Sequence, residues 1–274
     1  MNSENDFMIS EDGVIEKYTG AETDVVIPQE IRGIAIRAIG KKAFYEKGLT
    51  SVVIPNSVIK IGNLAFCYNR LAELVIPESI TEIGENTFSR NQLANIVIPK
   101  KVTKIGAYAF AYNQLMEVII PDSVTVIRNY AFGENQLRAL TIPNSVTGIG
   151  IAAFTHNQLA RLTIPNSVEV ICASAFAYNQ LTEVIIPNNV TKIGMAAFFR
   201  NQLKMVIIPD NVKKIGECAF EGNQINTITI LGEVSLPRRN QKPVFNNGFD
   251  DFYKSSKKRS GTYLFDGKNW SIKE

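Results

Sequence analysis

Apolar and polar positions follow a pattern that repeats every 22 residues through most of the chain. One repeat unit, residues 71–92, reads LAELVIPESITEIGENTFSRNQ, and the next, residues 93–114, reads LANIVIPKKVTKIGAYAFAYNQ. We number the positions of each unit from its leading leucine, so that Leu71 and Leu93 occupy position 1. A fixed period of this length predicts a solenoid, in which each unit forms one coil and buries its apolar side chains only against neighbouring coils.

Positions 4 to 6 predict a short β-strand in every coil. Positions 4 and 6 are apolar, position 6 is isoleucine in each unit, and a β-branched residue lies between them. Such strands are expected to stack as a parallel sheet about 4.8 Å apart, with positions 4 and 6 facing the core. A proline at position 7 then ends the strand, because proline has no backbone N–H to donate to a ladder. These prolines are Pro55, Pro77, Pro99, Pro121, Pro143, Pro165, Pro187 and Pro209.

A second apolar pair, at positions 10 and 13, predicts a brief extended segment after the proline. The rest of each unit predicts turns that carry core side chains. Alanine and phenylalanine at positions 17 and 18, as at Ala109 and Phe110, predict a helical or 3₁₀ turn and a stacked file of aromatic rings. Glycine is usual at position 14, but Arg128 and Cys172 replace it in two units, so a positive φ is not expected there. Asparagine at position 21, as at Asn113, predicts a ladder of side-chain amides that bond to backbone groups of two adjacent coils.

The pattern changes at both ends, which predicts caps on the solenoid. Residues 1–21 contain Asp12-Gly13 between two apolar stretches and are assigned to an N-terminal capping hairpin. Residues 22–234 are assigned to the solenoid, with about ten coils and a five-residue insertion in the first coil near Arg32. Residues 235–274 are assigned to a C-terminal cap, with a helix at 247–255 and a hairpin around Asp266-Gly267.

The unit L-x-x-V-x-I-P-x-S-V-x-x-I-G-x-x-A-F-x-x-N-Q resembles the BspA-like, or treponemal, type of leucine-rich repeat over residues 22–234. The I-P, I-G and A-F pairs together make this resemblance specific, although many members have cysteine where this chain has Asn113. The resemblance implies an α/β leucine-rich-repeat solenoid of horseshoe type, rich in strand, with one short strand per coil. It also implies a non-enzymatic role in binding, often at the surface of bacteria that attach to hosts or to other cells.

Charge and hydropathy narrow the classes of function. The net charge is +3, but residues 236–274 contain nine Lys or Arg and four Asp or Glu, so the solenoid itself is close to neutral. No nucleic-acid-binding surface is therefore expected along the solenoid. Apolar runs such as 118–120 are short, so no transmembrane segment is expected. The start, MNSENDFMIS, has no signal-peptide pattern, which leaves two localisations open: cytoplasmic, or exported with the signal removed.

Candidate catalytic and metal-binding residues are few. His156 is the one histidine, Cys172 follows it 16 residues later, and no nucleophile or phosphate-binding motif accompanies them. The three cysteines, Cys67, Cys172 and Cys218, lie at different repeat positions, so we expect small side chains in or near the core, without a disulfide or a metal site. Asp122 and Asp210 occupy a position where other coils have Asn, Glu or Lys. We therefore expect no enzymatic activity, cofactor or metal.

The outer face of the predicted sheet is the candidate partner-binding surface. Position 5 points away from the core and forms a β-branched stripe, while positions 2 and 3 vary from coil to coil. The stripe has two interpretations: cross-strand packing that stabilises the sheet, or a recognition surface. Mixed charges around Arg138 and Arg161 favour a protein partner, of unknown identity, over a polyanion, with docking centred on coils four to eight. The candidate residues are Glu73, Val97, Met116, Glu117, Ile119, Arg138, Arg161, Glu183, Ile185, Met205 and Ile207.

Two further surfaces are weaker candidates for binding. Position 20 carries residue types that are frequent at interfaces. These residues are Tyr68, Arg90, Tyr112, His156, Tyr178 and Arg200. The basic run 254–259 is expected to be a solvated loop, with contact to an anionic surface as the alternative.

Two functions remain open for the chain. The first is adhesin-like recognition of proteins on a host or neighbouring cell, and the second is an intracellular protein–protein interaction scaffold. The oligomeric state is left open.

Overall fold

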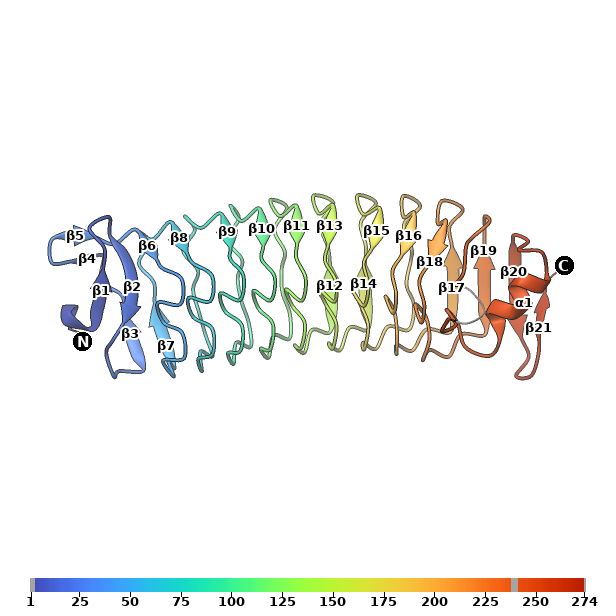
Figure 1. The fold of residues 1–274 in the computed structure, drawn as a ribbon, viewed down its shortest axis with the longest axis horizontal. Helices are drawn as coiled ribbons and strands as arrows, with labels where there is room; N and C mark the ends of the chain where they lie inside the picture. The colour runs from blue at the N-terminus through green and yellow to red at the C-terminus, as the bar shows by residue number, and fades with distance from the viewer. Residues whose placement is uncertain (1–2, 238–240, 274) are drawn as a thin grey trace. The chain divides into compact units, whose positions relative to one another are not determined.

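The computed structural model describes residues 3–237 and 241–273, and its ribbon is drawn in Figure 1. The chain divides into two compact units, Met1–Leu137 and Arg138–Glu274. In each unit, coils of about 22 residues stack through parallel strand pairs, which confirms the predicted strand-rich solenoid of about ten coils. The described residues contain one α-helix and one short 3₁₀ helix, and neither is long and apolar enough to cross a membrane.

The first unit, Met1–Leu137, opens with an antiparallel hairpin and continues as parallel coils. Its elements are η1 (Glu4–Asp6), β1 (Phe7–Ile9), β2 (Val14–Tyr18), β3 (Asp24–Val26), β4 (Glu30–Ile31), β5 (Ile34–Ala35), β6 (Ala38–Ile39), β7 (Ser51–Val53), β8 (Lys60–Ile61), β9 (Glu82–Ile83), β10 (Lys104–Ile105) and β11 (Val126–Ile127). β1 and β2 pair antiparallel around Asp12-Gly13, which confirms the predicted hairpin. β2 then pairs in parallel with β6, so the hairpin continues directly into the first coil. The insertion near Arg32 forms a small hairpin from β4 and β5.

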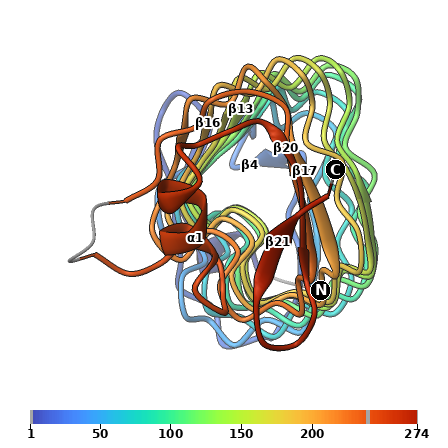
Figure 2. The same ribbon diagram turned by 90° about the vertical axis from the view of Figure 1, so that its right-hand side faces the viewer.

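The second unit, Arg138–Glu274, continues as coils and ends with a helix and a hairpin. Its elements are β12 (Ala139–Thr141), β13 (Gly148–Ile149), β14 (Arg161–Thr163), β15 (Val170–Ile171), β16 (Lys192–Ile193), β17 (Met205–Ile208), β18 (Lys214–Ile215), β19 (Thr227–Ile230), α1 (Phe249–Ser255), β20 (Gly261–Phe265) and β21 (Trp270–Ile272). β20 pairs antiparallel with both β19 and β21. Figure 2 looks onto this end and shows α1 beside the β20–β21 hairpin. The predicted helix is confirmed, with its start at Phe249, and so is the hairpin around Asp266-Gly267. The division into 1–21, 22–234 and 235–274 stays a prediction.

The brief extended segment expected at positions 10 to 13 contains a second short strand, in addition to the strand at positions 4 to 6. The predicted strand at positions 4 to 6 is represented by β3, β7, β12, β14, β17 and β19, whereas β8 to β11, β13, β15, β16 and β18 occupy positions 12 and 13. The second strand pairs in parallel and in register, for example Lys104 with Glu82 and Lys192 with Lys214. Figure 1 shows β8 to β11 following one another along the first unit. The more regular ladder is therefore the one at positions 12 and 13.

Tight turns replace the predicted helical or 3₁₀ turn at positions 15 to 20. Residues at positions 16 and 20, such as Asn86 and Arg90, have φ between 51° and 61°, except Gly222 with 78°, and all but Gly222 carry a Cβ atom. The N–H groups of Asn86, Phe88 and Arg90 donate to the carbonyls of Ala107, Ala109 and Ala111 in the following coil, each at 2.9 Å. A helix would direct these N–H groups back into its own segment. The alternating left-handed residues instead turn them toward the next coil.

Phenylalanines at position 18 form the predicted file of stacked rings. Neighbouring rings lie 5.0–5.8 Å apart between centroids and are fully buried in both units. Tyr18 of the N-terminal hairpin stacks on Phe44 at 5.4 Å, and Phe245 stacks on Phe220 at 5.1 Å. The buried Asp250 accepts the N–H groups of Val244 and Phe245, at 2.8 and 3.2 Å, and so fixes the end of the file. Burial raises the pKa of this carboxyl.

Asparagines at position 21 form the predicted amide ladder. The Nδ2 group of Asn113 donates to the carbonyl of Phe110 in its own coil, at 3.1 Å, and to that of Phe88 in the preceding coil, at 2.9 Å. Its Oδ1 accepts the N–H of Leu93 at 3.1 Å. The same three bonds recur at Asn69, Asn91, Asn135, Asn179, Asn201 and Asn223. Each side chain thus satisfies three buried backbone groups across two coils.

Glycine at position 14 allows two coils to approach closely. As predicted, Gly62, Gly106 and Gly194 do not have a positive φ. A Cβ atom built on Gly106 would lie 2.6 Å from both the carbonyl carbon and the oxygen of Gly84 in the preceding coil. Since these neighbours are backbone atoms, they cannot rotate away. The glycine is therefore kept for space and not for its conformational freedom.

Candidate functional site

Repeat position 5 forms a stripe of β-branched side chains, apolar throughout the first unit and interrupted by threonines in the second. Val75, Val97, Ile119 and Ile185 are 81%, 77%, 83% and 83% exposed, while their neighbours at positions 4 and 6 are buried. The predicted alternation is therefore confirmed. Side chains that packed across strands would cover one another, so exposures this high do not fit the cross-strand packing interpretation. Isolated exposed apolar residues are ordinary on protein surfaces, but a repeated stripe of them is not.

Strand pairing at positions 4 to 6 is interrupted where the stripe is most exposed. Within the described residues, 74–76 and 184–186 form no ladder, and 96–98 meets 118–120 through one bridge between Val97 and Ile119. Elsewhere the pairing is intact, as in β3 with β7, β12 with β14, and β17 with β19. Where the pairing is interrupted, the outer surface opens between coils.

Each unit has a hollow at such an opening. In the first unit, a hollow of about 550 Å³ exposes the edges of the core residues Ile96, Ile98 and Val118 between the stripe residues Val97 and Ile119. Its rim carries four charged residues, Glu78, Lys100, Glu117 and Asp122. In the second unit, a hollow of about 410 Å³ is lined by Glu183, Ile185, Lys204, Met205 and Ile207. A concave apolar floor with a few charged groups at the rim is the usual form of a binding site.

The structure exposes all the candidate residues predicted from the sequence and gathers some of them in these hollows. Val97, Glu117 and Ile119 line the first hollow, and Glu183, Ile185, Met205 and Ile207 line the second. Glu73, Met116, Arg138 and Arg161 are exposed but lie outside both hollows. The binding role of these residues stays a prediction. Sequence reasoning did not find the hollows, although position 3 is Glu or Asn in every coil with interrupted pairing and another residue in the coils whose strands form ladders.

The residues at position 20 form stacked files on the turn side of the coils. In the first unit, the guanidinium of Arg90 lies 4.9 Å from the Tyr68 ring centroid and 4.2 Å from that of Tyr112. In the second, His156 stacks on Tyr178 at 4.1 Å, and Arg200 lies 5.7 Å from the same tyrosine. The faces of these planar groups stack on one another, so mainly their edges are exposed to solvent. The files therefore stabilise the turns and are poorly suited to stacking on a ligand.

Cysteine chemistry gives no reactive centre. All three cysteines are free, with Cys67 and Cys218 buried and Cys172 partly buried, which confirms the expectation of small side chains in or near the core. Burial raises the pKa of the Cys67 and Cys172 thiols, and desolvation raises the pKa of Cys218 to about 12. The thiolate is the reactive form, so these thiols are weak nucleophiles at neutral pH. No group of three or more His, Cys, Asp or Glu side chains within residues 3–237 and 241–273 is placed to hold a metal ion.

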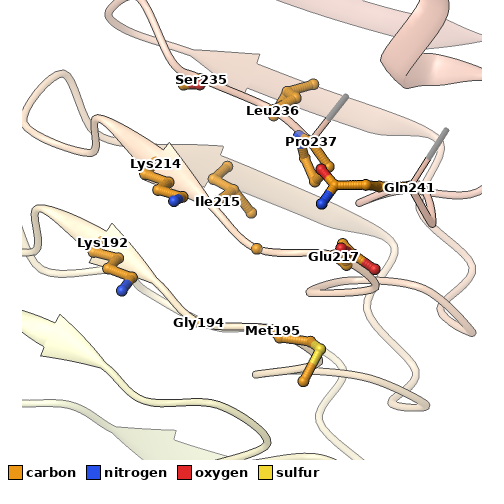
Figure 3. Close-up of a pocket in the computed structure, with 11 residues that line it drawn as sticks. Lys192, Gly194, Met195, Lys214, Ile215, Glu217, Ser235, Leu236, Pro237 and Gln241 are labelled. Atoms are coloured by element: carbon orange, nitrogen blue, oxygen red, sulfur yellow. The ribbon is translucent and has the colours of Figure 1, made fainter. Parts of the chain in front are cut away.

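A third hollow, of about 600 Å³, lies in the second unit on the face of positions 12 and 13. Lys192 of β16 and Lys214 of β18 contribute to one side, followed by Ser235, and Figure 3 shows these three side chains on successive segments. Met195, Glu217, Leu236 and Gln241 also line it. We call this hollow the lysine pocket. Its lysines occupy position 12 of the repeat and not position 5, and the pocket was not predicted from the sequence.

Comparisons with known proteins agree with the sequence pattern. A family model described as a BspA type leucine rich repeat region matches residues 37–159 and 125–240, with six copies. No curated protein matches the chain.

Three solved bacterial structures show the same fold. The pneumococcal vaccine antigen PcpA has a TM-score of 0.60 and 20% identity, over 80% of this chain and 64% of that one. A leucine-rich repeat protein from Bacteroides ovatus has a TM-score of 0.55 and 22% identity, over 85% and 62% of the two chains. One from Eubacterium ventriosum has a TM-score of 0.52 and 21% identity, over 82% and 70%. The chain spans less than two thirds of the first two proteins, and at these identities the likeness concerns the fold alone.

Proposed function

Because the chain belongs to the BspA-type leucine-rich repeat family, we propose that it is an adhesin-like protein whose position-5 face binds a protein of a host or neighbouring cell. Leucine-rich repeats are protein–protein interaction modules, typically without enzymatic activity, that bind through the extended surface created by stacked coils. The adhesin-like role is supported by the family resemblance. The observation that carries the choice of face is the stripe of β-branched side chains, four of which are 77–83% exposed.

The hollows and charges of this face fit a protein partner. A partner side chain that enters the first hollow would cover the exposed edges of Ile96, Ile98 and Val118, and burial of apolar surface stabilises the complex by about 25 cal/mol per Å². The face carries charges of both signs, with Glu117 in the first unit and Glu183, Arg138 and Arg161 in the second. Mixed charges select a partner with complementary charges and disfavour uniform polyanions. Aromatic and aliphatic anchors of a partner would form the centre of such an interface.

Paired isoleucine variants test the choice of face. The double variant Ile119→Ser/Ile185→Ser removes one apolar contact in each unit, and Ile59→Ser changes an isoleucine that is 58% exposed at position 11, outside the face. Binding is measured by biolayer interferometry against extracellular-matrix proteins. We expect the double variant to raise Kd about tenfold or more, as hot-spot truncations do, and Ile59→Ser to leave it unchanged. Equal losses in both variants would contradict the assignment of the face.

Charge reversal tests the contribution of the basic residues. Arg138→Glu with Arg161→Glu is expected to weaken binding while the thermal melt stays unchanged, because both side chains are exposed. An unaltered affinity would contradict their role.

The alternative function is an intracellular scaffold that uses the same face. A pull-down from the cytosol of the source cell, run beside the extracellular-matrix panel, separates the two. Saturable binding to a cytosolic protein, with none to the matrix panel, would favour the scaffold. Binding to the matrix panel that is lost in the isoleucine double variant would favour the adhesin-like role.

A further inference from the structure

The lysine pocket contains a like-charged pair in register on adjacent strands. Lys192 and Lys214 are directly paired residues of the parallel strands β16 and β18. Such strands lie about 4.8 Å apart, and like charges placed directly opposite each other destabilise a sheet. The first unit shows the opposite arrangement at the same repeat position, where Lys104 lies opposite Glu82 and their charged atoms are 3.9 Å apart. Among the described residues, neither Lys192 nor Lys214 forms a salt bridge.

The pair lines an open hollow of the surface, and Lys192, Lys214 and Ser235 are all exposed to solvent. The pocket has a volume of about 600 Å³, and Ser235 continues the file because it bridges in parallel to Lys214. Figure 3 shows Lys192, Lys214 and Ser235 in one file, with Met195 and Glu217 across the hollow. Three donors therefore lie on one wall, and the apolar side chains of Met195 and Leu236 contribute to the remaining lining. Among the lining residues that the structure describes, Glu217 adds one negative charge to the two positive charges of the lysines.

From this arrangement we infer that the lysine pocket binds a compact organic anion, a phosphate or sulfate monoester on an apolar or aromatic body. A monoester has three terminal oxygens, which can accept from the two ammonium groups and the Ser235 hydroxyl, and charge-assisted bonds of this kind are the strong ones. The bound anion would also remove the repulsion between the lysines. Its apolar body would contact Met195 and Leu236, while Glu217 disfavours long polyanions. This site does not depend on the protein-binding role of the position-5 face.

The test is a titration of the full chain, followed by amide NMR, with phenyl phosphate, phenyl sulfate, inorganic phosphate and phenol. We expect saturable shifts at residues 192–195 and 214–217 with the two esters, weaker shifts with inorganic phosphate, and none with phenol. Lys192→Gln combined with Lys214→Gln should raise Kd about tenfold or more, since each lost charge-assisted bond contributes strongly to affinity. Lys104→Gln is the matched control, because it removes a lysine at the same repeat position outside the pocket.

A second variant separates binding from folding. Lys192→Glu recreates the Glu–Lys order of Glu82 and Lys104, so we expect it to abolish ester binding and to raise Tm by about 1–2 °C. Equal Kd values for wild type and the lysine double variant would overturn the proposal, as would an equal effect of Lys104→Gln. Phenol binding as tight as that of phenyl phosphate would assign the pocket to the aromatic body alone and would also overturn it.

Discussion

The position-5 face and the turn side of the same coils differ in how strongly the fold restricts the residue types at each position. On the turn side, Asn113 makes three buried hydrogen bonds, and Phe88 and Phe110 stack at 5.6 Å. On the face, Val97 and Ile119 extend into solvent from backbone that is paired through one bridge. The asparagine is the same in eight coils because its amide must meet three backbone groups at fixed positions. The face varies because little of the fold depends on it.

The largest expected effect comes from removal of one amide of the ladder. Asn113→Ala leaves the N–H of Leu93 unpaired in a buried region and removes one of the two amide bonds at the carbonyls of Phe88 and Phe110, which still accept from the neighbouring asparagines. We expect a loss of about 2–5 kcal/mol in the free energy of unfolding, since the orphaned N–H costs about 1–3 kcal/mol and each of the two lost bonds about 0.5–1.5 kcal/mol. Urea denaturation measures the change. The adjacent, exposed Gln114→Ala is the control and should remain within about 0.5 kcal/mol of wild type; a similar loss there would show that the amide ladder is not the cause.

A methyl group at position 14 should have the next largest effect. Gly106→Ala places a Cβ atom 2.6 Å from backbone atoms of Gly84, so the two coils must separate locally. Overpacking of this kind costs about 1–3 kcal/mol, and the shift in Tm reports it. Arg128 occupies the same position in the following coil and is exposed. Arg128→Ala should therefore change Tm little, and an equal loss in both variants would contradict the steric explanation.

Replacement of two adjacent alanines on the turn side by glycine should change the free energy of unfolding in opposite directions. Ala196 has φ of 53°, a conformation that disfavours residues with a Cβ, whereas Ala197 is buried and is not among the residues with positive φ. We expect Ala196→Gly to stabilise the protein by about 0.5 kcal/mol after the added flexibility of the unfolded chain is included, and Ala197→Gly to destabilise it by about 1 kcal/mol. Paired denaturation curves measure both. Destabilisation by both substitutions would show that the left-handed turns are not strained.

The smallest effect on stability is expected on the face. Ile119→Ser removes a side chain that is 83% exposed, so the free energy of unfolding should change by less than about 0.5 kcal/mol. Thermal and urea unfolding provide the measurement. A loss above about 1 kcal/mol would mean that the stripe stabilises the sheet after all, and would restore the cross-strand packing interpretation.

Most of the core could be predicted from the repeat, because buried positions and the amide ladder require the same residue type in each coil. Isoleucine at position 6, phenylalanine at position 18 and asparagine at position 21 were all assigned their correct surroundings from identity and phase. The left-handed turns were missed because position 20 holds Tyr112, His156 or Arg200 and shows no glycine preference. Gly222, at position 20 of a later coil with φ of 78°, was the one available signal.

The candidate surface could be predicted only in part. Alternation along the strand correctly exposed Val97 and Ile185, since the direction of side chains follows from a period of two. The hollows depend instead on which neighbouring strands pair, and residues 93–98 and 137–142 follow the same motif although one segment pairs through a bridge and the other through a ladder. The lysine pocket likewise depends on Ser235 and Leu236, which lie beyond the last regular repeat.

The fixed offsets of the amide ladder have a consequence for how the chain reaches its fold. Each asparagine bonds to groups 3, 20 and 25 residues before it, and the same offsets recur in successive coils. Every loop that must close is therefore short and nearly equal in length, so each added coil has a similar entropic cost. Folding can start at any pair of coils and extend like a zipper in either direction. Whole 22-residue segments can also be gained or lost without a change in any remaining contact geometry, so the length of the protein can change in evolution without redesign of its core.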